Sequence, residues 1–197
     1  VQKDVKKLIA YSSVSHLGFC VLGLFALDRG DIGAVGSVLY MVNHGLSTGA
    51  LFLCVGMIYE RFHTREMAEM SGLARVMPVW GFFTVFFVLA SVGLPGLNGF
   101  VGEFLTLMGA FVSGEVLGPP YAVAAGFGMI FAAMYLLYMV GKVVLGPVKV
   151  PHVDRAFSLD AEGHRPQDLR PREIAALVPL AVALLVLGLF PNPVIQT

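Results

Sequence analysis

The sequence predicts an all-α protein, a polytopic transmembrane helix bundle of about five spans with one discontinuous helix (78–94 and 99–113). Hydrophobic residues make up 57% of the 197 residues and charged residues 13%, whereas soluble domains carry about 25% charged residues. The mean hydropathy is +0.80. Apolar runs of bilayer-spanning length alternate with polar loops, and the longest run has helix-breaking residues near its middle.

The apolar runs can be followed along the chain as one transmembrane domain, 1–197. The predicted spans cover about 8–27, 32–59, 78–113 (broken near 95–99), 121–145 and 174–190. The chain begins with Val1, and its basic start runs into a full-length span without a cleavage site. This start is therefore not a signal peptide, and we expect a piece cut from a longer polypeptide.

The longest apolar run, between positions 75 and 115, carries a single charge, Glu103. One membrane span needs about 20 residues, and this run has nearly twice that length. Pro95 removes a backbone donor, while Gly96 and Gly99 free the backbone dihedrals, so helix is interrupted here. The run is either a hairpin of two short spans or one span made of two half-helices.

Loop charges distinguish these alternatives. With one broken span, eleven basic residues fall on one side of the membrane and only Arg29 on the other, whereas a hairpin divides them evenly. The positive-inside bias favours the broken span, with loops 60–77 and 146–172 cytoplasmic (or in the matrix) and the C-terminus on the outer, periplasmic side. Lys142, near a span end, is expected to snorkel. The eleven residues are Lys3, Lys6, Lys7, Arg61, Arg65, Arg75, Lys149, Arg155, Arg165, Arg170 and Arg172.

Glu103 follows Gly99 by four residues, at the expected start of the second half-helix. Charged side chains facing hydrocarbon are costly and rare unless they have a function. Burial disfavours the ionised carboxylate and the helix N-terminus favours it, which leaves the group able to take and release a proton. Alternatively, Glu103 only caps the half-helix or pairs with a basic residue. Because broken helices around an ionisable residue are typical of ion transporters, we predict a proton-carrying role.

Two histidines, His16 and His44, fall near the middle of the first and second spans. Imidazole can accept a proton on one nitrogen and release it from the other, which suits a relay. Alternatively, both are neutral histidines that hold the bundle together through hydrogen bonds. Two such histidines and a buried carboxylate within three consecutive spans favour a proton path. Each has hydroxyl neighbours on its own helix face: Ser12 and Ser13 for His16, Ser47 and Thr48 for His44.

The remaining small and polar residues receive structural interpretations. Gly45 and Gly49 form a small-xxx-small face that predicts close helix packing. Asn98 either satisfies freed backbone groups or holds water. Cys20 and Cys54 are predicted to be small core residues.

The motif search predicts no cofactor or metal in this chain. His63, His152 and His164 lie in polar loops without metal-ligand spacing. GxGxxG, P-loop and CxxC motifs are missing from the sequence, so we expect no bound nucleotide, flavin or iron-sulfur cluster. A formal net charge of zero gives no indication of a nucleic-acid partner.

Four stretches of the sequence together resemble a known family. They are DVKKLIAYSSVSHLG (4–18), NHGLS (43–47), YERFHTR (59–65) and GLPGLNGFVGEFL (93–105). In this order they are similar to the antiporter-like membrane subunits of respiratory complex I, NADH:quinone oxidoreductase, and most similar to its subunit M branch, subunit four in mitochondria. His16 follows Ser-Val-Ser where subunit L typically has Gln, and Glu103 stands where subunits L and N typically have Lys.

The resemblance implies a bundle of about fourteen helices built from two inverted repeats, of which this chain would be most of the second repeat plus the closing helices. Glu103 would match the terminal carboxylate of the half-channel toward the periplasmic side, and His16 and His44 the polar axis that leads to it. A central lysine and the first repeat's glutamate-lysine pair would lie upstream of Val1, so this chain alone would lack half of the pathway.

The resemblance also implies partners and a location. NADH, FMN, iron-sulfur clusters and quinone would be bound by other subunits, and the partners would be other membrane subunits of complex I, especially neighbouring antiporter-like subunits. The protein would reside in the bacterial inner membrane or the mitochondrial inner membrane. Subunits of multi-subunit sodium/proton antiporters and of membrane-bound hydrogenases share the motifs and remain an alternative. A passive structural anchor is a third possibility.

Overall fold

The computed structural model describes residues 2–26, 31–114, 117–149 and 167–191, and within them the chain is almost entirely helical. No strand occurs in these ranges, where extended pairing is limited to the isolated bridges Asp4–Glu66 and Ser71–Lys149. The predicted all-α class is confirmed. The helices are α1 (Val5–Leu24), α2 (Ile32–Phe62), the 3-10 turn η1 (Leu73–Arg75), α3 (Pro78–Ser91), α4 (Asn98–Val112), α5 (Pro119–Met139), the π-helical turn η2 (Val140–Val144) and α6 (Pro171–Leu189).

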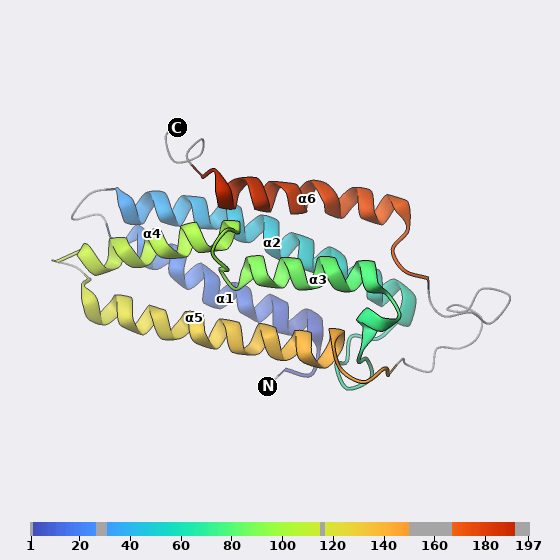
Figure 1. Ribbon diagram of the computed structural model, residues 1–197. Coiled ribbons are helices and arrows are strands. Elements are labelled where there is room, and N and C mark those ends of the chain that lie inside the picture. The colour runs from blue at the N-terminus through green and yellow to red at the C-terminus, as the bar shows by residue number, and fades with distance from the viewer. Residues whose placement is uncertain (1, 27–30, 115–116, 150–166, 192–197) are drawn as a thin grey trace, which may run out of the picture.

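The helices form one elongated bundle around α2 (Figure 1). Helix α2 contacts α1, α3, α4 and α6, while α5 packs against α1 and α4. Helices α3 and α4 follow one another end to end along α2, and the chain breaks between them about half-way along the bundle (Figure 1). The bundle therefore has a discontinuous helix where the sequence predicts one.

The lengths of the helices separate continuous spans from half-spans. Helix α1, helix α2, helix α5 with η2, and helix α6 are each long and apolar enough to cross a membrane. Helices α3 and α4 have 14 and 15 residues, which at about 1.5 Å per residue gives roughly 22 Å each, less than the roughly 30 Å of hydrocarbon. Neither half crosses alone, so the end-to-end pair corresponds to one span and the hairpin alternative does not hold.

Short-range chemistry explains where the helices start. The carboxylate of Asp4 accepts a hydrogen bond from Lys7 N at 3.0 Å and caps α1. Helix α3 starts with Pro78, and the Asp168 carboxylate, supplied from the segment before α6, accepts from Val79 N at 2.7 Å and Trp80 N at 3.1 Å. Proline also opens α5 and α6, where its missing N–H costs nothing.

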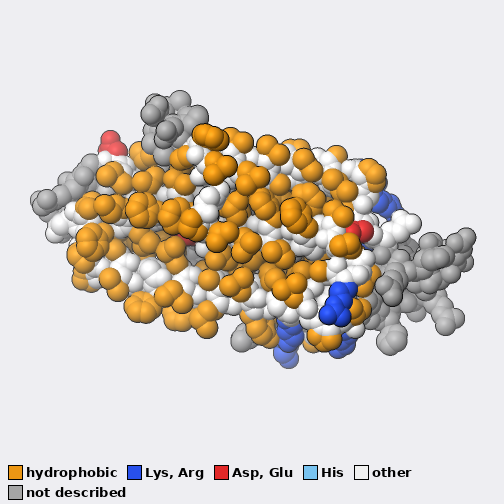
Figure 2. Space-filling model, in the orientation of Figure 1, with side chains coloured by type: hydrophobic (Ala, Val, Ile, Leu, Met, Phe, Trp, Pro, Cys, Tyr) orange, Lys and Arg blue, Asp and Glu red, His pale blue; other side chains and the backbone are white. Residues whose placement is uncertain are grey.

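The described cationic side chains gather at one end of the bundle (Figure 2). Backbone hydrogen bonds from Val5 N to Arg65 O and from Ser71 N to Lys149 O hold these loops together. The Arg61 guanidinium there forms an ion pair with Glu173 at 2.7 Å and so joins α2 to α6. Among residues 2–26, 31–114, 117–149 and 167–191, the Lys and Arg residues are Lys3, Lys6, Lys7, Arg61, Arg65, Arg75, Lys142, Lys149, Arg170 and Arg172.

Between its ends the surface is apolar. Hydrophobic side chains cover most of the visible face in Figure 2, as expected for helices that lie in hydrocarbon. Lys142, near the end of its helix, donates a hydrogen bond to the Tyr138 hydroxyl at 3.2 Å, and its snorkelling stays a prediction. On α5 the large exposed hydrophobic residues are Tyr121, Val123, Phe127, Ile130, Phe131, Met134, Leu137 and Tyr138.

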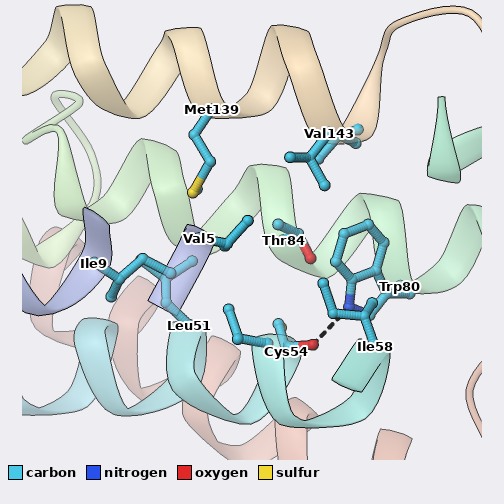
Figure 3. Close-up of a pocket in the computed structure, with 11 residues that line it drawn as sticks. Val5, Ile9, Leu51, Cys54, Ile58, Trp80, Thr84, Met139 and Val143 are labelled. Atoms are coloured by element: carbon cyan, nitrogen blue, oxygen red, sulfur yellow. Dashed lines mark hydrogen bonds between the residues drawn. The ribbon is translucent and has the colours of Figure 1, made fainter. Parts of the chain in front are cut away.

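A small pocket lies within the apolar core toward the charged end, and Figure 3 shows the side chains that line it. It is lined by side chains of α1, α2, α3, α5 and η2, and the largest of these is Trp80, which is 1% exposed. Trp80 Nε1 donates to Cys54 O at 3.0 Å, which satisfies the one polar atom of the indole. Cys54 belongs to this core and Cys20 to a smaller cluster, as predicted.

Glycines allow α1, α2 and α4 to approach closely, but not the pair predicted to do so. A Cβ on Gly33 would overlap the Gly23 carbonyl of α1 and Ala26, which follows α1, and one on Gly109 would overlap Gly33. Gly45 and Gly49 have no atom of the described chain within 4 Å of an added Cβ. The prediction of close packing at Gly45 and Gly49 is therefore wrong within the described residues, because their side of α2 faces away from the bundle.

Candidate functional site

The break between α3 and α4 is made by glycines in the left-handed region. Gly93 has φ +79° and Gly96 has φ +94°, values that favour glycine because it lacks a Cβ. Gly99, predicted to be part of the interruption, lies inside α4, which starts one residue earlier at Asn98. Gly188 of α6 packs directly on the backbone of Gly96 and Leu97, which encloses the break on that side.

Two asparagine side chains join the break to α2. Asn43 Nδ2 donates to the backbone carbonyl of Asn98 at 2.7 Å, and Asn98 Nδ2 donates to that of Asn43 at 3.1 Å. Both residues are fully buried, and each Oδ1 accepts no hydrogen bond from the described protein. The carbonyl that Asn98 bonds belongs to the continuous helix α2 and is not a backbone group freed by the break. The two free oxygens leave acceptors for water.

Glu103 lies on α4 with its carboxyl group turned toward this break. It is 2% exposed, and its Oε1 accepts a hydrogen bond from the Tyr40 hydroxyl at 2.7 Å. A Cβ on Gly93 would overlap Oε2, so that oxygen rests on the glycine of the break. In the described chain Oε2 has no hydrogen-bond partner, and no Lys or Arg pairs with the carboxyl.

This position excludes one alternative that the sequence leaves open. Helix α4 has no acidic residue in its first turn, and Glu103 is its sixth residue, so the carboxyl group does not cap the half-helix. The helix-terminus effect expected at Glu103 is correspondingly small because it fades within the first turn. The buried carboxyl group instead accepts a hydrogen bond from the Tyr40 hydroxyl of α2.

His16 lies on α1 within reach of the same tyrosine. Its Nδ1 is 2.5 Å from the Tyr40 oxygen and 3.8 Å from Glu103 Oε1, beyond hydrogen-bond length. The second nitrogen, Nε2, is buried and has no partner in the described protein. The predicted neighbour Ser12 donates to the Ile9 carbonyl at 2.7 Å, so it serves its own helix.

His44 is less buried and lies beside His16. The two ring centroids are 5.1 Å apart with the planes inclined by 34°. Thr48 Oγ1 lies 3.2 Å from His44 Nδ1, as predicted from the four-residue spacing, while Ser47 donates to the His44 carbonyl. The structure thus brings His16, His44 and Glu103 together around Tyr40.

Tyr40 is the member of this cluster that sequence reasoning missed. It precedes His44 by four residues and is 2% exposed. The same spacing that paired His44 with Thr48 could have placed Tyr40 on the histidine face of α2. A Cβ on Gly102 would overlap Tyr40, so a glycine on α4 gives the tyrosine room to reach Glu103.

Of the loop histidines, only His63 is among the described residues, and it lies away from the site. His63 ends α2 in a left-handed conformation at the charged end of the bundle. His152 and His164, together with Arg29, Arg155 and Arg165, lie outside the described residues. Among the residues that the structure describes, no group of three His, Cys, Asp or Glu side chains could hold a metal ion.

The fold and this site together define a polytopic membrane protein whose discontinuous helix carries a buried carboxyl group. The family profile described as "NADH:quinone oxidoreductase/Mrp antiporter, TM" matches residues 1–127. The chain belongs to this family.

Curated relatives agree with the family assignment. NADH-ubiquinone oxidoreductase chain 4 of Chondrus crispus is 41% identical over 191 residues, which cover 97% of this chain and 36% of the relative. NADH-quinone oxidoreductase subunit M of Rhodobacter capsulatus is 43% identical over 191 residues, 97% of this chain and 34% of the relative. The chain thus spans about a third of the length of these relatives, and the resemblance to the subunit M branch is confirmed.

Solved structures share the fold. A chain of respiratory complex I from Thermus thermophilus with bound NADH superimposes with a TM-score of 0.80 at 34% identity, covering 99% of this chain and 39% of that one. A chain of the Mrp complex from Dietzia sp. DQ12-45-1b gives a TM-score of 0.77 at 23% identity, covering 95% of this chain and 40% of that one. The second likeness bears on the fold alone.

Proposed function

We propose that this chain forms part of a proton-translocating membrane subunit of an NADH:quinone oxidoreductase, and that protons move through His16 and His44 to Glu103. The observation that carries the proposal is the buried Glu103 carboxyl at the helix break, linked through hydrogen bonds to a histidine on another helix. Buried ionisable groups at broken membrane helices mark ion pathways. Electron transfer and quinone reduction elsewhere in the complex would drive the change of charge along this path.

The partners and the location proposed for the chain follow from its similarity to subunits of NADH:quinone oxidoreductases. Its partners are other membrane subunits of the complex, the neighbouring antiporter-like subunits above all, and lipid. NADH, FMN, iron-sulfur clusters and quinone are held by those other subunits. The positive-inside bias of the cationic end supports a cytoplasmic or matrix orientation for that end and a periplasmic C-terminus. The membrane is the bacterial inner membrane or its mitochondrial counterpart.

A sodium/proton antiporter or membrane-bound hydrogenase subunit is the second candidate. The family description includes Mrp antiporters, and the Mrp chain shares the fold at 23% identity. Higher identity to the quinone oxidoreductase subunits, 41% and 43%, supports the first candidate. Purifying the native complex decides between them, because co-purified NADH-binding and quinone-binding subunits support the first and their replacement by small antiporter subunits supports the second.

The test of the proposal is Glu103→Gln in the intact complex. Gln keeps the size and hydrogen-bonding reach of the side chain but cannot bind and release a proton. We expect assembly to be retained while quinone-linked NADH oxidation and proton pumping fall together, by roughly 100-fold if transfer at this site becomes limiting. The matched control is Glu60→Gln, the same exchange at an exposed position of α2. Normal pumping by an assembled Glu103→Gln complex would remove Glu103 from the pathway.

A further inference from the structure

Three hydrogen-bonding groups from three helices meet in a row at the break. His16 comes from α1, Tyr40 from α2 and Glu103 from α4, and their relative exposures are 1%, 2% and 2%. The tyrosine oxygen lies 2.5 Å from His16 Nδ1 and 2.7 Å from Glu103 Oε1. The histidine and the carboxylate are themselves 3.8 Å apart. A proton passing directly between them would have to cross a gap longer than a hydrogen bond.

We infer that the Tyr40 hydroxyl is the group that passes the proton between His16 and Glu103. The inference rests on the proposed function and names a residue that the path needs in this chain. A phenol suits the position because one oxygen both accepts and donates a hydrogen bond. Here it donates to Glu103 Oε1, so His16 must donate to it from a protonated Nδ1.

The hydrogen-bond directions define a balanced transfer. A proton arrives at His16 Nε2, the buried nitrogen that has no partner among the described residues. The Nδ1 proton then moves to the Tyr40 oxygen while the hydroxyl proton moves to the Glu103 carboxylate. One proton enters the chain of groups and one reaches the carboxyl group, while the tyrosine remains neutral and the histidine becomes the Nε2–H tautomer. Release of the proton from the Glu103 carboxyl group, rotation of the hydroxyl and return of the histidine tautomer restore the first state.

The packing around Tyr40 holds the hydroxyl at this position. The Cβ and ring of Tyr40 lie directly on Gly102 of α4, where any larger residue would overlap them. The Phe19 ring packs edge-on at a centroid distance of 6.1 Å. Contacts on both sides fix the direction of the ring, and the short distances to His16 and Glu103 follow from that fixed direction.

The inference is tested in the intact complex with two substitutions of the same residue. Tyr40→Phe keeps the ring and removes the hydroxyl, so it should preserve assembly and lower proton pumping by roughly 100-fold. Tyr40→Ser removes the ring but leaves a polar space in which water can bridge His16 and Glu103. The relay therefore predicts that the serine variant, per assembled complex, pumps faster than the phenylalanine variant.

A purely structural tyrosine predicts the opposite order, because phenylalanine preserves the packing and serine does not. That order, or normal pumping by Tyr40→Phe, overturns the relay. Tyr121→Phe, at an exposed position of α5, is the control for loss of a tyrosine hydroxyl. If Glu103→Gln blocks pumping while Tyr40→Phe does not, only the inference fails; if Glu103→Gln pumps normally, the proposed function fails.

A spectroscopic measurement covers the case in which Tyr40 variants fail to assemble. Infrared difference spectra of the wild-type complex during NADH-driven turnover are compared with and without ring-¹³C tyrosine. The relay predicts an isotope-sensitive tyrosine C–O band that changes together with the carboxyl band lost in Glu103→Gln. A carboxyl change without any isotope-sensitive tyrosine band overturns the inference.

Discussion

The bundle contains two buried regions that differ in their chemistry. Around Trp80, toward the charged end, the core is mainly apolar, and the indole N–H donates a hydrogen bond to the Cys54 carbonyl (Figure 3). Around the α3–α4 break, Asn43, Asn98 and Glu103 are equally buried but leave polar atoms without partners in the described chain. The first region has one such atom among the side chains that line it, Thr84 Oγ1. The second keeps costly polar groups where an apolar core would be cheaper, which indicates a use beyond stability.

Truncation of the apolar region should have the largest effect on stability. Trp80→Ala removes a side chain that is 1% exposed and contacts several helices. We expect a loss of about 3–5 kcal/mol in the free energy of unfolding of the full-length subunit in mixed micelles. Any complex that still assembles should pump at the normal rate per molecule. A loss below about 1 kcal/mol would mean that this region is not a close-packed core.

A methyl group at the break should affect both stability and transport. Gly93→Ala places a Cβ at φ +79° and on Oε2 of Glu103, so the carboxyl group must leave its position against Gly93. We expect about 1–3 kcal/mol of backbone strain together with a marked loss of pumping. The control is Gly96→Ala, which has φ +94° but open space around an added Cβ.

Comparing these two alanine variants separates the effect of moving the carboxyl group from the effect of backbone strain. Both should lose similar stability, measured by unfolding in mixed micelles, and only Gly93→Ala should lose pumping in an assembled complex. Equal pumping by the two variants would show that the position of the carboxyl group against Gly93 has no consequence for transport.

A smaller effect is expected at the asparagine pair. Asn98→Ala removes the donor to the Asn43 carbonyl and leaves that buried oxygen without this hydrogen bond. We expect a loss of about 1–2 kcal/mol in unfolding free energy, less than at Trp80, and a partial loss of pumping because the start of α4 is held less firmly. A stability loss as large as that of Trp80→Ala would mean that the hydrogen bonds at the break contribute as much to the stability of the fold as the apolar core does.

Much of the fold could be predicted because hydropathy and helix breakers act locally. The long apolar run with Pro95 and Gly96 at its middle indicated a split helix, and α3 and α4 are separated there. Loop charges indicate the same topology. In the structure the basic loops lie at one end of the bundle, where backbone hydrogen bonds hold them together. The exact turning residue, Gly93, was not predicted because several glycines in the run were equally suitable.

The site could be predicted only in part because its contacts join distant residues. Glu103 and the histidines stood out as ionisable residues in apolar runs. Tyr40 did not, since it lies 24 residues from His16 and 63 from Glu103 and only the packing of α1, α2 and α4 brings the three together. Ser12, a neighbour of His16 on the same helix face, does not bond to the histidine because its hydroxyl donates to the Ile9 carbonyl of its own helix.

The central claim is that Glu103 takes up and releases a proton at the helix break, and infrared difference spectroscopy of the intact complex tests it most directly. During NADH-driven turnover the wild-type spectrum should contain a protonated-carboxyl C=O band that is missing from the spectrum of Glu103→Gln. Identical carboxyl regions in the two spectra, from complexes that are both assembled and turning over, would contradict the claim.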